Sequence, residues 1–250
     1  IGRPKGIPLI IDNTASPVIC KPLAHGAAIV MHSLTKYIGG HGTSIGGIVV
    51  DGGNFDWTKN RKRQPLLNEP DQSYGGAVWI DAVPQLTGAN IPFVIRLRVV
   101  LLRDTGAPLA PFNAWQIIQG LETVGLRMKQ HCSNAEKVVT FLETQKKVQN
   151  VIYPTNHQGE IKERALKYMK GGYGSLVGMD VGTKENGAKF IDNLKMLYHV
   201  ANIGDARSLA IHPATTTHSQ LNDKELLAAG VTPGYVRLSI GIEHPDDIIA

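Results

Sequence analysis

The stretch that decides the fold is residues 27–51, which read AAIVMHSLTKYIGGHGTSIGGIVVD. Apolar runs at both of its ends predict buried strands, and between them lie two hydroxyls, a lysine and a dense run of glycines. Lys36 falls just past the carboxyl end of the first strand, which is where ligands bind in open α/β sheets. Ser33 and Thr35 alternate as the chain leaves that strand, so we expect both hydroxyls to face one anion while Lys36 reaches over it.

An earlier apolar run supplies an acid at the same sheet edge. IPLII at residues 7–11 predicts a strand that ends in Asp12. Taken alone, Asp12 has an equally good structural interpretation, because DNT is also a favourable turn or helix N-cap sequence. Together, a lysine for a Schiff base, hydroxyls for a phosphate and an acid for a pyridinium nitrogen are the protein groups that pyridoxal phosphate requires. The acid keeps the ring nitrogen protonated, and the lysine, once displaced by a substrate amine, becomes a base beside the α-carbon.

The same residues also match a different kind of site. Ser33 and Lys36 fit the Ser-x-x-Lys motif of penicillin-recognising serine acylases. Those enzymes need Ser-Asp-Asn and Lys-Thr-Gly elsewhere, and neither string occurs in this sequence. The nearest string, Gly182-Thr183-Lys184, has the wrong order. The acylase interpretation is therefore strongly disfavoured.

Composition limits the remaining classes of function. With 250 residues, 42% of them hydrophobic, the chain can bury a substantial core. Its formal charge of +5 comes with one dense basic run, residues 59–63, which is more typical of a solvated loop than of a nucleic-acid site. Cys20 and Cys132 are too few for a disulfide framework and lack metal spacing, and they fit a reducing cytosol. The apolar run 93–103 is interrupted by arginines, so we expect an amphipathic helix and no membrane association.

The order of predicted elements indicates an α/β fold with two domains. The first strands are continuous apolar runs, which is typical of a parallel sheet covered on both faces. Residues 52–92 are rich in proline and glycine and predict a long loop-like insertion, and 111–143 predicts helix. We expect a boundary near residue 122, with a cofactor-binding domain at 1–122 and a smaller α+β domain at 123–250.

The motifs together resemble the Cys/Met-metabolism family of pyridoxal-phosphate enzymes, which have fold type I with a large mixed-sheet domain. The resemblance covers essentially the whole chain. Its motifs are DNT at 12–14, HSLTKYIGGHGTSIGG at 32–47, LLRDTGAPLAPFNAWQIIQGLETVGLRM at 101–128, NIGDARSLAIHPATTTHSQL at 202–221 and VRLSIGIE at 236–243. The long segment between Asp51 and Phe93, with NEPDQSYGG inside it, is similar to the O-acetylhomoserine sulfhydrylase branch.

The resemblance implies a role for each matching residue. It identifies Lys36 as the Schiff-base lysine, Asp12 as the partner of the pyridine nitrogen, and Ser33 and Thr35 as ligands of the cofactor phosphate. No metal is implied. Arg237, in VRLSIGIE, would bind the substrate carboxylate, for which a guanidinium is well suited.

A second substrate contact is implied less directly. Asn202, in ANIGDA, stands where related lyases often carry a serine that helps to hold the same carboxylate.

The activity implied is replacement of the γ-acetoxy group of O-acetylhomoserine by sulfide or a small thiol. The reaction would give homocysteine or methionine through a pyridoxal-phosphate aldimine, in a cytoplasmic homotetramer of methionine biosynthesis. A cystathionine γ-synthase or a methionine or cystathionine γ-lyase of the same family stays open as an alternative. The sequence does not distinguish sulfide from other thiols, or acetyl from succinyl.

The resemblance also implies that the chain is the C-terminal part of a longer enzyme. It opens without a methionine, on IGRPKG, and enters a strand within a few residues. In the family, the preceding portion supplies phosphate-binding amides and the tyrosine that stacks on the cofactor ring. We therefore expect an incomplete site, completed by a portion that a separate chain could carry. A catalytically inactive fragment is the remaining alternative.

Overall fold

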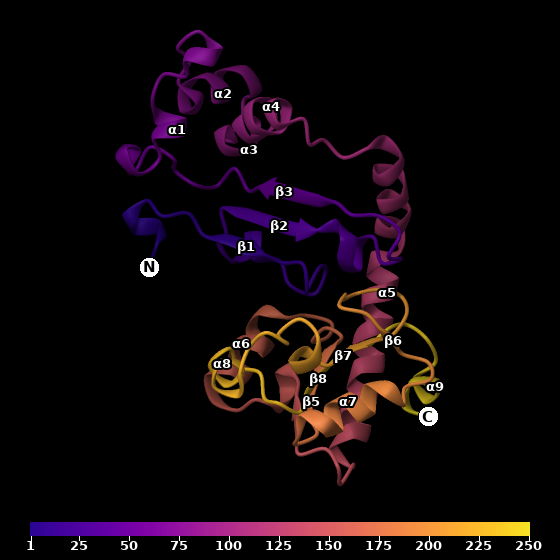
Figure 1. Ribbon diagram of the computed structural model, residues 1–250. Coiled ribbons are helices and arrows are strands. Elements are labelled where there is room, and N and C mark those ends of the chain that lie inside the picture. The colour runs from indigo at the N-terminus through magenta and orange to yellow at the C-terminus, as the bar shows by residue number, and fades with distance from the viewer. The chain divides into compact units, whose positions relative to one another are not determined.

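In the computed structural model, which describes residues 1–250, the chain forms two units (Figure 1). Unit 1 consists of Ile1–Thr14, Lys21–Ser33 and Gly46–Ala114, and unit 2 of Ala15–Cys20, Leu34–Ile45 and Trp115–Ala250. The chain thus passes between the units directly after Ser33. Lys36 belongs to unit 2, although the strand before it belongs to unit 1.

Unit 1 contains a three-stranded sheet in the order β1-β2-β3, with β1 Ile10–Asp12, β2 Ile29–Ser33 and β3 Gly47–Asp51. β1 and β2 are parallel, with Asp12 opposite Met31, so their carboxyl ends lie at one edge as predicted. β3 pairs with β2 antiparallel, so the sheet is mixed, as the family resemblance implies, and not parallel throughout as the apolar pattern alone suggested. The connection between β2 and β3 contains only the turn Leu34–Ile38 and no crossover helix of the kind that usually joins parallel strands.

Short helices interrupt the segment 52–92, which was predicted to be loop-like, and further helices follow it where 93–103 was predicted to be helical. Near β3 in Figure 1 lie α1 Pro65–Asn68, α2 Trp79–Thr87, α3 Pro92–Arg96 and α4 Arg103–Thr105. Leu67, Trp79 and Val83 pack with Ile29 of β2 and with the buried Trp57. Pro65 and Pro92 begin α1 and α3, and Gly88 caps the end of α2, so these prolines and this glycine mark the ends of short helices. No single helix is long and apolar enough to cross a membrane, and α2 reaches that composition only in combination with Pro92–Thr105, bent by 100°.

Helix α5, Pro111–Glu143, is the longest element of the chain (Figure 1). Gly120 and Gly125 do not interrupt it. The predicted domain boundary at 122/123 lies inside this helix, whereas the two units divide between Ala114 and Trp115. The division into domains at residue 122 stays a prediction.

Unit 2 contains a five-stranded sheet in the order β4-β5-β8-β7-β6. Its strands are β4 Asn150–Ile152, β5 Leu176–Asp180, β6 Tyr198–His199, β7 Leu209–Ile211 and β8 Tyr235–Ser239, and its helices besides α5 are α6 Gly159–Tyr168, α7 Lys184–Asp192, α8 Asp223–Ala228 and α9 Pro245–Ile249. β6 and β7 are parallel and the other pairs antiparallel, which agrees with the predicted α+β character.

Alternation along β8 decides which face of this sheet carries a polar group. Val236 and Leu238 belong to the core formed with α5 and α7, so Arg237 between them points to the opposite face. On that face, the Ser239 hydroxyl accepts a hydrogen bond from the Gly204 amide at 2.9 Å. This bond fixes the loop that contains Asn202 next to Arg237.

Short turns complete the chain. They are 3₁₀ turns at Arg3–Lys5, Pro22–His25, Arg61–Arg63, Gln72–Tyr74, Pro154–Asn156 and Pro213–Thr215, and π-helical turns at Leu34–Ile38 and Leu97–Leu102.

Candidate active site

In unit 1, the carboxyl ends of β1 and β2 are joined through Thr14. The Asp12 carboxylate accepts a hydrogen bond from the Thr14 amide at 2.9 Å, and the Thr14 hydroxyl accepts one from the Ser33 amide at 2.7 Å. A third bond, from the Asn13 amide to the Met31 carbonyl, continues the ladder beyond the strand. The DNT sequence therefore forms a turn, which was one of its two structural interpretations. This turn leaves the Asp12 carboxylate exposed at the sheet edge.

The charge of Asp12 is stabilised locally. Hydrogen bonds from the Thr14 side chain and amide hold the pKa of the Asp12 carboxyl below its usual value, and His32 adds a smaller electrostatic contribution. Burial in turn lowers the pKa of His32, although Asp12 offsets part of that effect. His32 Nδ1 is buried and has no hydrogen-bond partner. This edge of unit 1 thus presents one carboxylate that stays ionised near neutral pH.

In unit 2, Lys36 lies within the π-helical turn Leu34–Ile38 and has non-helical backbone angles, φ −92° and ψ −131°. The Gly39 amide donates to the Leu34 carbonyl at 2.9 Å, and the Gly40 amide to the Lys36 carbonyl at 2.7 Å. Strand geometry therefore ends at Ser33, and the argument that Ser33 and Thr35 face one side by alternation is wrong. Ser33 is the last residue of β2 and Thr35 lies in the turn, and both side chains are half-buried.

Three polar side chains converge in unit 2. Lys36 Nζ donates to Asn202 Oδ1 at 2.5 Å, and Arg237 Nη2 donates to the Asn202 carbonyl at 3.3 Å. Burial lowers the pKa of the Lys36 amine, and the positive charge of Arg237 lowers it further. Two cations are thus held beside one amide, and the amine is neutral over a wider pH range than that of an exposed lysine.

No carboxylate neutralises this pair. Neither Lys36 nor Arg237 takes part in an ion pair, and both side chains are half-buried. A partly desolvated guanidinium without an acidic partner is suited to bind a carboxylate ligand. The neutral-leaning amine of Lys36 is suited to attack an aldehyde. The residues of unit 2 therefore fit a pyridoxal cofactor and an amino-acid substrate, and the ionised Asp12 of unit 1 fits a protonated ring nitrogen.

Sequence reasoning missed the residue that fastens the Lys36 turn. The Arg127 guanidinium, on α5, is buried and donates to the carbonyls of Tyr37 at 2.7 Å and Ile38 at 3.0 Å. A signal for it exists in the sequence, because Arg127 shares a helix face with the half-buried Val124 and the buried His131 at three- and four-residue spacings. A charged residue on an apolar helix face requires a partner.

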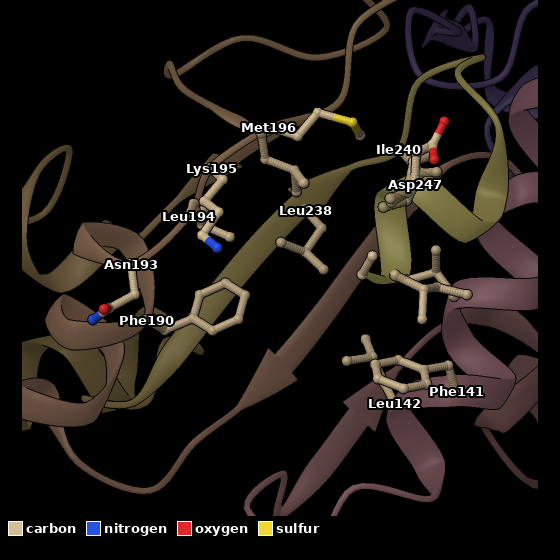
Figure 2. A pocket seen from close by; sticks show the side chains of 15 residues that line it. Phe141, Leu142, Phe190, Asn193, Leu194, Lys195, Met196, Leu238, Ile240 and Asp247 are labelled. Carbon is tan, nitrogen blue, oxygen red and sulfur yellow. The ribbon is translucent and has the colours of Figure 1, made fainter.

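An apolar cavity of unit 2 lies apart from this site. It has a volume of about 480 Å³ and is apolar, with Phe141 and Leu142 of α5, Phe190 of α7 and Leu238 of β8 in its wall (Figure 2). None of the predicted site residues lines it. Apolar character and volume alone would therefore have directed attention away from the polar cluster around Lys36.

Comparison with known proteins points to one family. A family model described as Cys/Met metabolism PLP-dependent enzyme matches residues 1–250. The chain is 49% identical over 255 residues to the O-acetyl-L-homoserine sulfhydrylase of Leptospira meyeri, and the match covers 100% of the chain and 57% of that protein. The chain thus spans little more than half the length of this curated relative.

Two solved structures are similar. A putative O-acetylhomoserine (thiol)-lyase from Campylobacter jejuni superposes with a TM-score of 0.87 at 40% identity, over 98% of this chain and 57% of that one. That structure carries N'-pyridoxyl-lysine-5'-monophosphate at its own position 205. A cystathionine gamma synthase from Xanthomonas oryzae pv. oryzae superposes with a TM-score of 0.75 at 28% identity, over 98% of this chain and 54% of that one.

Proposed function

Because the chain belongs to the Cys/Met-metabolism family of PLP-dependent enzymes, we propose that it carries the reactive lysine of an O-acetylhomoserine sulfhydrylase. The reaction is replacement of the γ-acetoxy group of O-acetylhomoserine by sulfide or a small thiol. Sulfide gives homocysteine and acetate, and methanethiol gives methionine and acetate. The observation that carries the proposal is the half-buried Lys36 amine, which lies against Asn202 and beside the unpaired cation of Arg237.

Four residues are proposed to hold pyridoxal phosphate. Lys36 binds its aldehyde carbon, Ser33 and Thr35 bind its phosphate, and the ionised Asp12 accepts a hydrogen bond from the ring nitrogen. When bound, the cofactor supplies an electron-withdrawing ring that stabilises negative charge at the substrate's α-carbon. Asp12 supports this by remaining a carboxylate, so that the ring nitrogen keeps its proton.

Lys36 and Arg237 are proposed to act on the substrate. Arg237 binds the substrate carboxylate, and the Asn202 carbonyl orients the guanidinium for that contact. Once Lys36 is free, its amine accepts a proton from the substrate's carbon chain. The lowered pKa leaves more of the amine unprotonated near neutral pH, as a general base needs. Asn202 Oδ1 accepts a hydrogen bond from the same amine and so defines its position.

We propose that Lys36 corresponds to the modified lysine of the Campylobacter structure, of which this chain covers 57%. We further propose that the enzyme is a cytoplasmic homo-oligomer, a tetramer as the family resemblance implies, and the two cysteines, which form no disulfide, agree with a reducing compartment.

The closest rival function is that of a cystathionine γ-synthase or γ-lyase. The higher identity to the sulfhydrylase, 49% against 28% for the solved cystathionine gamma synthase, favours the sulfhydrylase. A further alternative, an inactive fragment, rests on the 57% coverage of the relatives.

One experiment addresses both the site and the reaction. The chain is incubated with pyridoxal phosphate, reduced with borohydride and mapped by mass spectrometry, with Lys36→Ala and the exposed Lys129→Ala as a matched pair. We expect a pyridoxyl label on Lys36 that only Lys36→Ala removes, and a label spread over surface lysines would overturn the site. Acetate release from O-acetylhomoserine is then measured with and without sulfide. Release that requires sulfide supports the sulfhydrylase, whereas α-ketobutyrate formed without sulfide identifies a lyase.

A further inference from the structure

Arg127 makes an unusually complete set of contacts with the backbone around Lys36. Its Nη1 donates to the Tyr37 carbonyl at 2.7 Å, and its Nη2 to the carbonyls of Ile38 at 3.0 Å and Gly120 at 2.6 Å. Its Nε donates to the Thr123 hydroxyl at 3.2 Å. Two of these four acceptors are the residues directly after Lys36, and the other two belong to α5 itself.

The backbone on both sides leaves room only for this arrangement. A Cβ added to Gly120 would lie 2.1 Å from the Gly39 carbonyl oxygen, so the turn and α5 approach as closely as a glycine permits. A Cβ added to Gly40 would lie 2.1 Å from Arg127 Nη1, and Gly40 also has a positive φ of 68°. The guanidinium therefore fills the space beside Gly40, and Gly120 lets the backbone of the turn approach α5.

Arg127 is a buried charge without an ion pair. It is 5% exposed, and Asp205, whose charge acts on it, is engaged by Arg207 at 3.0 Å. A buried cation is stabilised only if its donors are satisfied, and here backbone carbonyls satisfy them. Lysine could not replace it, because an ammonium cannot bond two successive carbonyls and a helix carbonyl in one plane.

We propose that Arg127 is a positioning residue for Lys36: by binding the carbonyls of Tyr37 and Ile38, it holds the turn on α5 and so keeps the amine against Asn202. This inference rests on the proposed function only for the role of the Lys36 amine in the reaction. The Gly40 amide donates a hydrogen bond to the Lys36 carbonyl at 2.7 Å. A displacement of the turn therefore also displaces the backbone of Lys36. Without Arg127 the amine would lose Asn202 and become more hydrated.

The test measures the amine directly. The full chain is labelled with trace acetic anhydride over a series of pH values, and acetylation of Lys36 is quantified relative to the exposed Lys129 of the same molecules. In the unmodified protein, the midpoint for Lys36 should lie below that for Lys129. In Arg127→Lys it should move up towards the Lys129 midpoint, although the charge is conserved. Val138→Ala, which removes core packing from α5 far from the turn, is the control and should retain the original midpoint.

A second variant keeps the proposal testable if Arg127→Lys does not fold. Gly40→Ala should displace the guanidinium from the other side and shift the Lys36 midpoint in the same direction. If the two act through one contact, the double variant should shift the midpoint no further than either alone. A midpoint equal to that of the unmodified protein in both single variants, or a shift of equal size in Val138→Ala, would overturn the proposal.

Trapping with pyridoxal phosphate and borohydride separates this inference from the proposed function. Misplacement of a reacting group by about 1 Å can cost on the order of 100-fold in rate, so we expect Lys36 in both variants to be labelled about 10- to 100-fold more slowly. If the unmodified protein is not labelled at Lys36, the proposed function fails. The acetylation midpoints still decide the role of Arg127 in that case.

Discussion

Each unit holds one half of the candidate residues, and the two halves are built in different ways. In unit 1, Asp12 is held by Thr14, two positions away. The same threonine accepts a hydrogen bond from the amide of Ser33, which lies on the neighbouring strand β2. In unit 2, Lys36 is held by Asn202, 166 positions away, and Arg237 reaches the same residue from a separate strand. The first half follows from local turn chemistry, whereas the second exists only after unit 2 has folded.

The halves also differ in charge. The unit 1 edge presents an acid whose ionisation is favoured by neighbouring hydrogen bonds. The unit 2 cluster presents two cations that no acid neutralises, one of them with a lowered pKa. Pyridoxal phosphate needs an acid beside its ring nitrogen, whereas the anionic groups of the cofactor and the substrate need cations. We therefore expect substitution of Arg237 in unit 2 to affect substrate binding most, and substitution of Asp12 in unit 1 to affect the cofactor.

Arg237→Ala should have the largest effect. Loss of the guanidinium leaves the substrate carboxylate unpaired, which typically costs 2 kcal/mol or more, so KM for O-acetylhomoserine should rise by about 30-fold or more. Arg237→Lys keeps the charge but loses the two-point contact, so its KM should lie between that of the unmodified protein and that of Arg237→Ala. Acetate-release kinetics with sulfide check this. An unchanged KM in Arg237→Ala would remove the carboxylate role and with it the contrast between the halves.

Asp12→Ala should act on the cofactor instead. Loss of one charge-assisted hydrogen bond, worth about 1.5–3 kcal/mol, should weaken pyridoxal phosphate binding roughly 10- to 100-fold. KM for the substrate at saturating cofactor should change little. Fluorescence titration with the cofactor and the same kinetic assay separate the two effects. A substrate defect without a cofactor defect would reverse the assignment of the halves.

The sequence predicted the local half well because its signals are local. The ends of β1 and β2, the glycines after Lys36 and the long helix 111–143 all follow from residue pattern, and the structure confirms them. Asn202 and Arg237 entered only through resemblance to a family, since nothing in their own segments relates them to Lys36. The apolar content of β3 did not reveal that it pairs antiparallel with β2, because apolar runs are compatible with either strand direction. The position of Arg127 on a helix face indicates that it needs a partner, but its partners are backbone carbonyls, which the sequence does not identify.

Gly120→Ala tests the long-range half without touching a polar group. Alanine normally stabilises a helix relative to glycine by about 1 kcal/mol. At position 120, however, the new Cβ would overlap the Gly39 carbonyl oxygen, and overpacking of this kind costs about 1–3 kcal/mol. Gly125 of the same helix has open space around it, so Gly125→Ala should be stabilising. Urea unfolding of both variants measures the difference, and equal changes in the free energy of unfolding would contradict the close docking of the turn on α5.

Thr14→Val should have the smallest effect, and it tests the local half. The substitution removes the hydroxyl bond that contributes most to the lowered pKa of Asp12, so that pKa should rise towards its ordinary value of about 3.9. Because a lowered carboxyl pKa adds stability that is lost as pH falls through the folded-state value, the variant should lose this contribution at a higher pH than the original protein. Carboxyl chemical shifts followed by NMR titration of the chain give the pKa directly. If the pKa of Asp12 does not change, its ionisation depends on groups other than Thr14, and the unit 1 half is less local than its hydrogen bonds indicate.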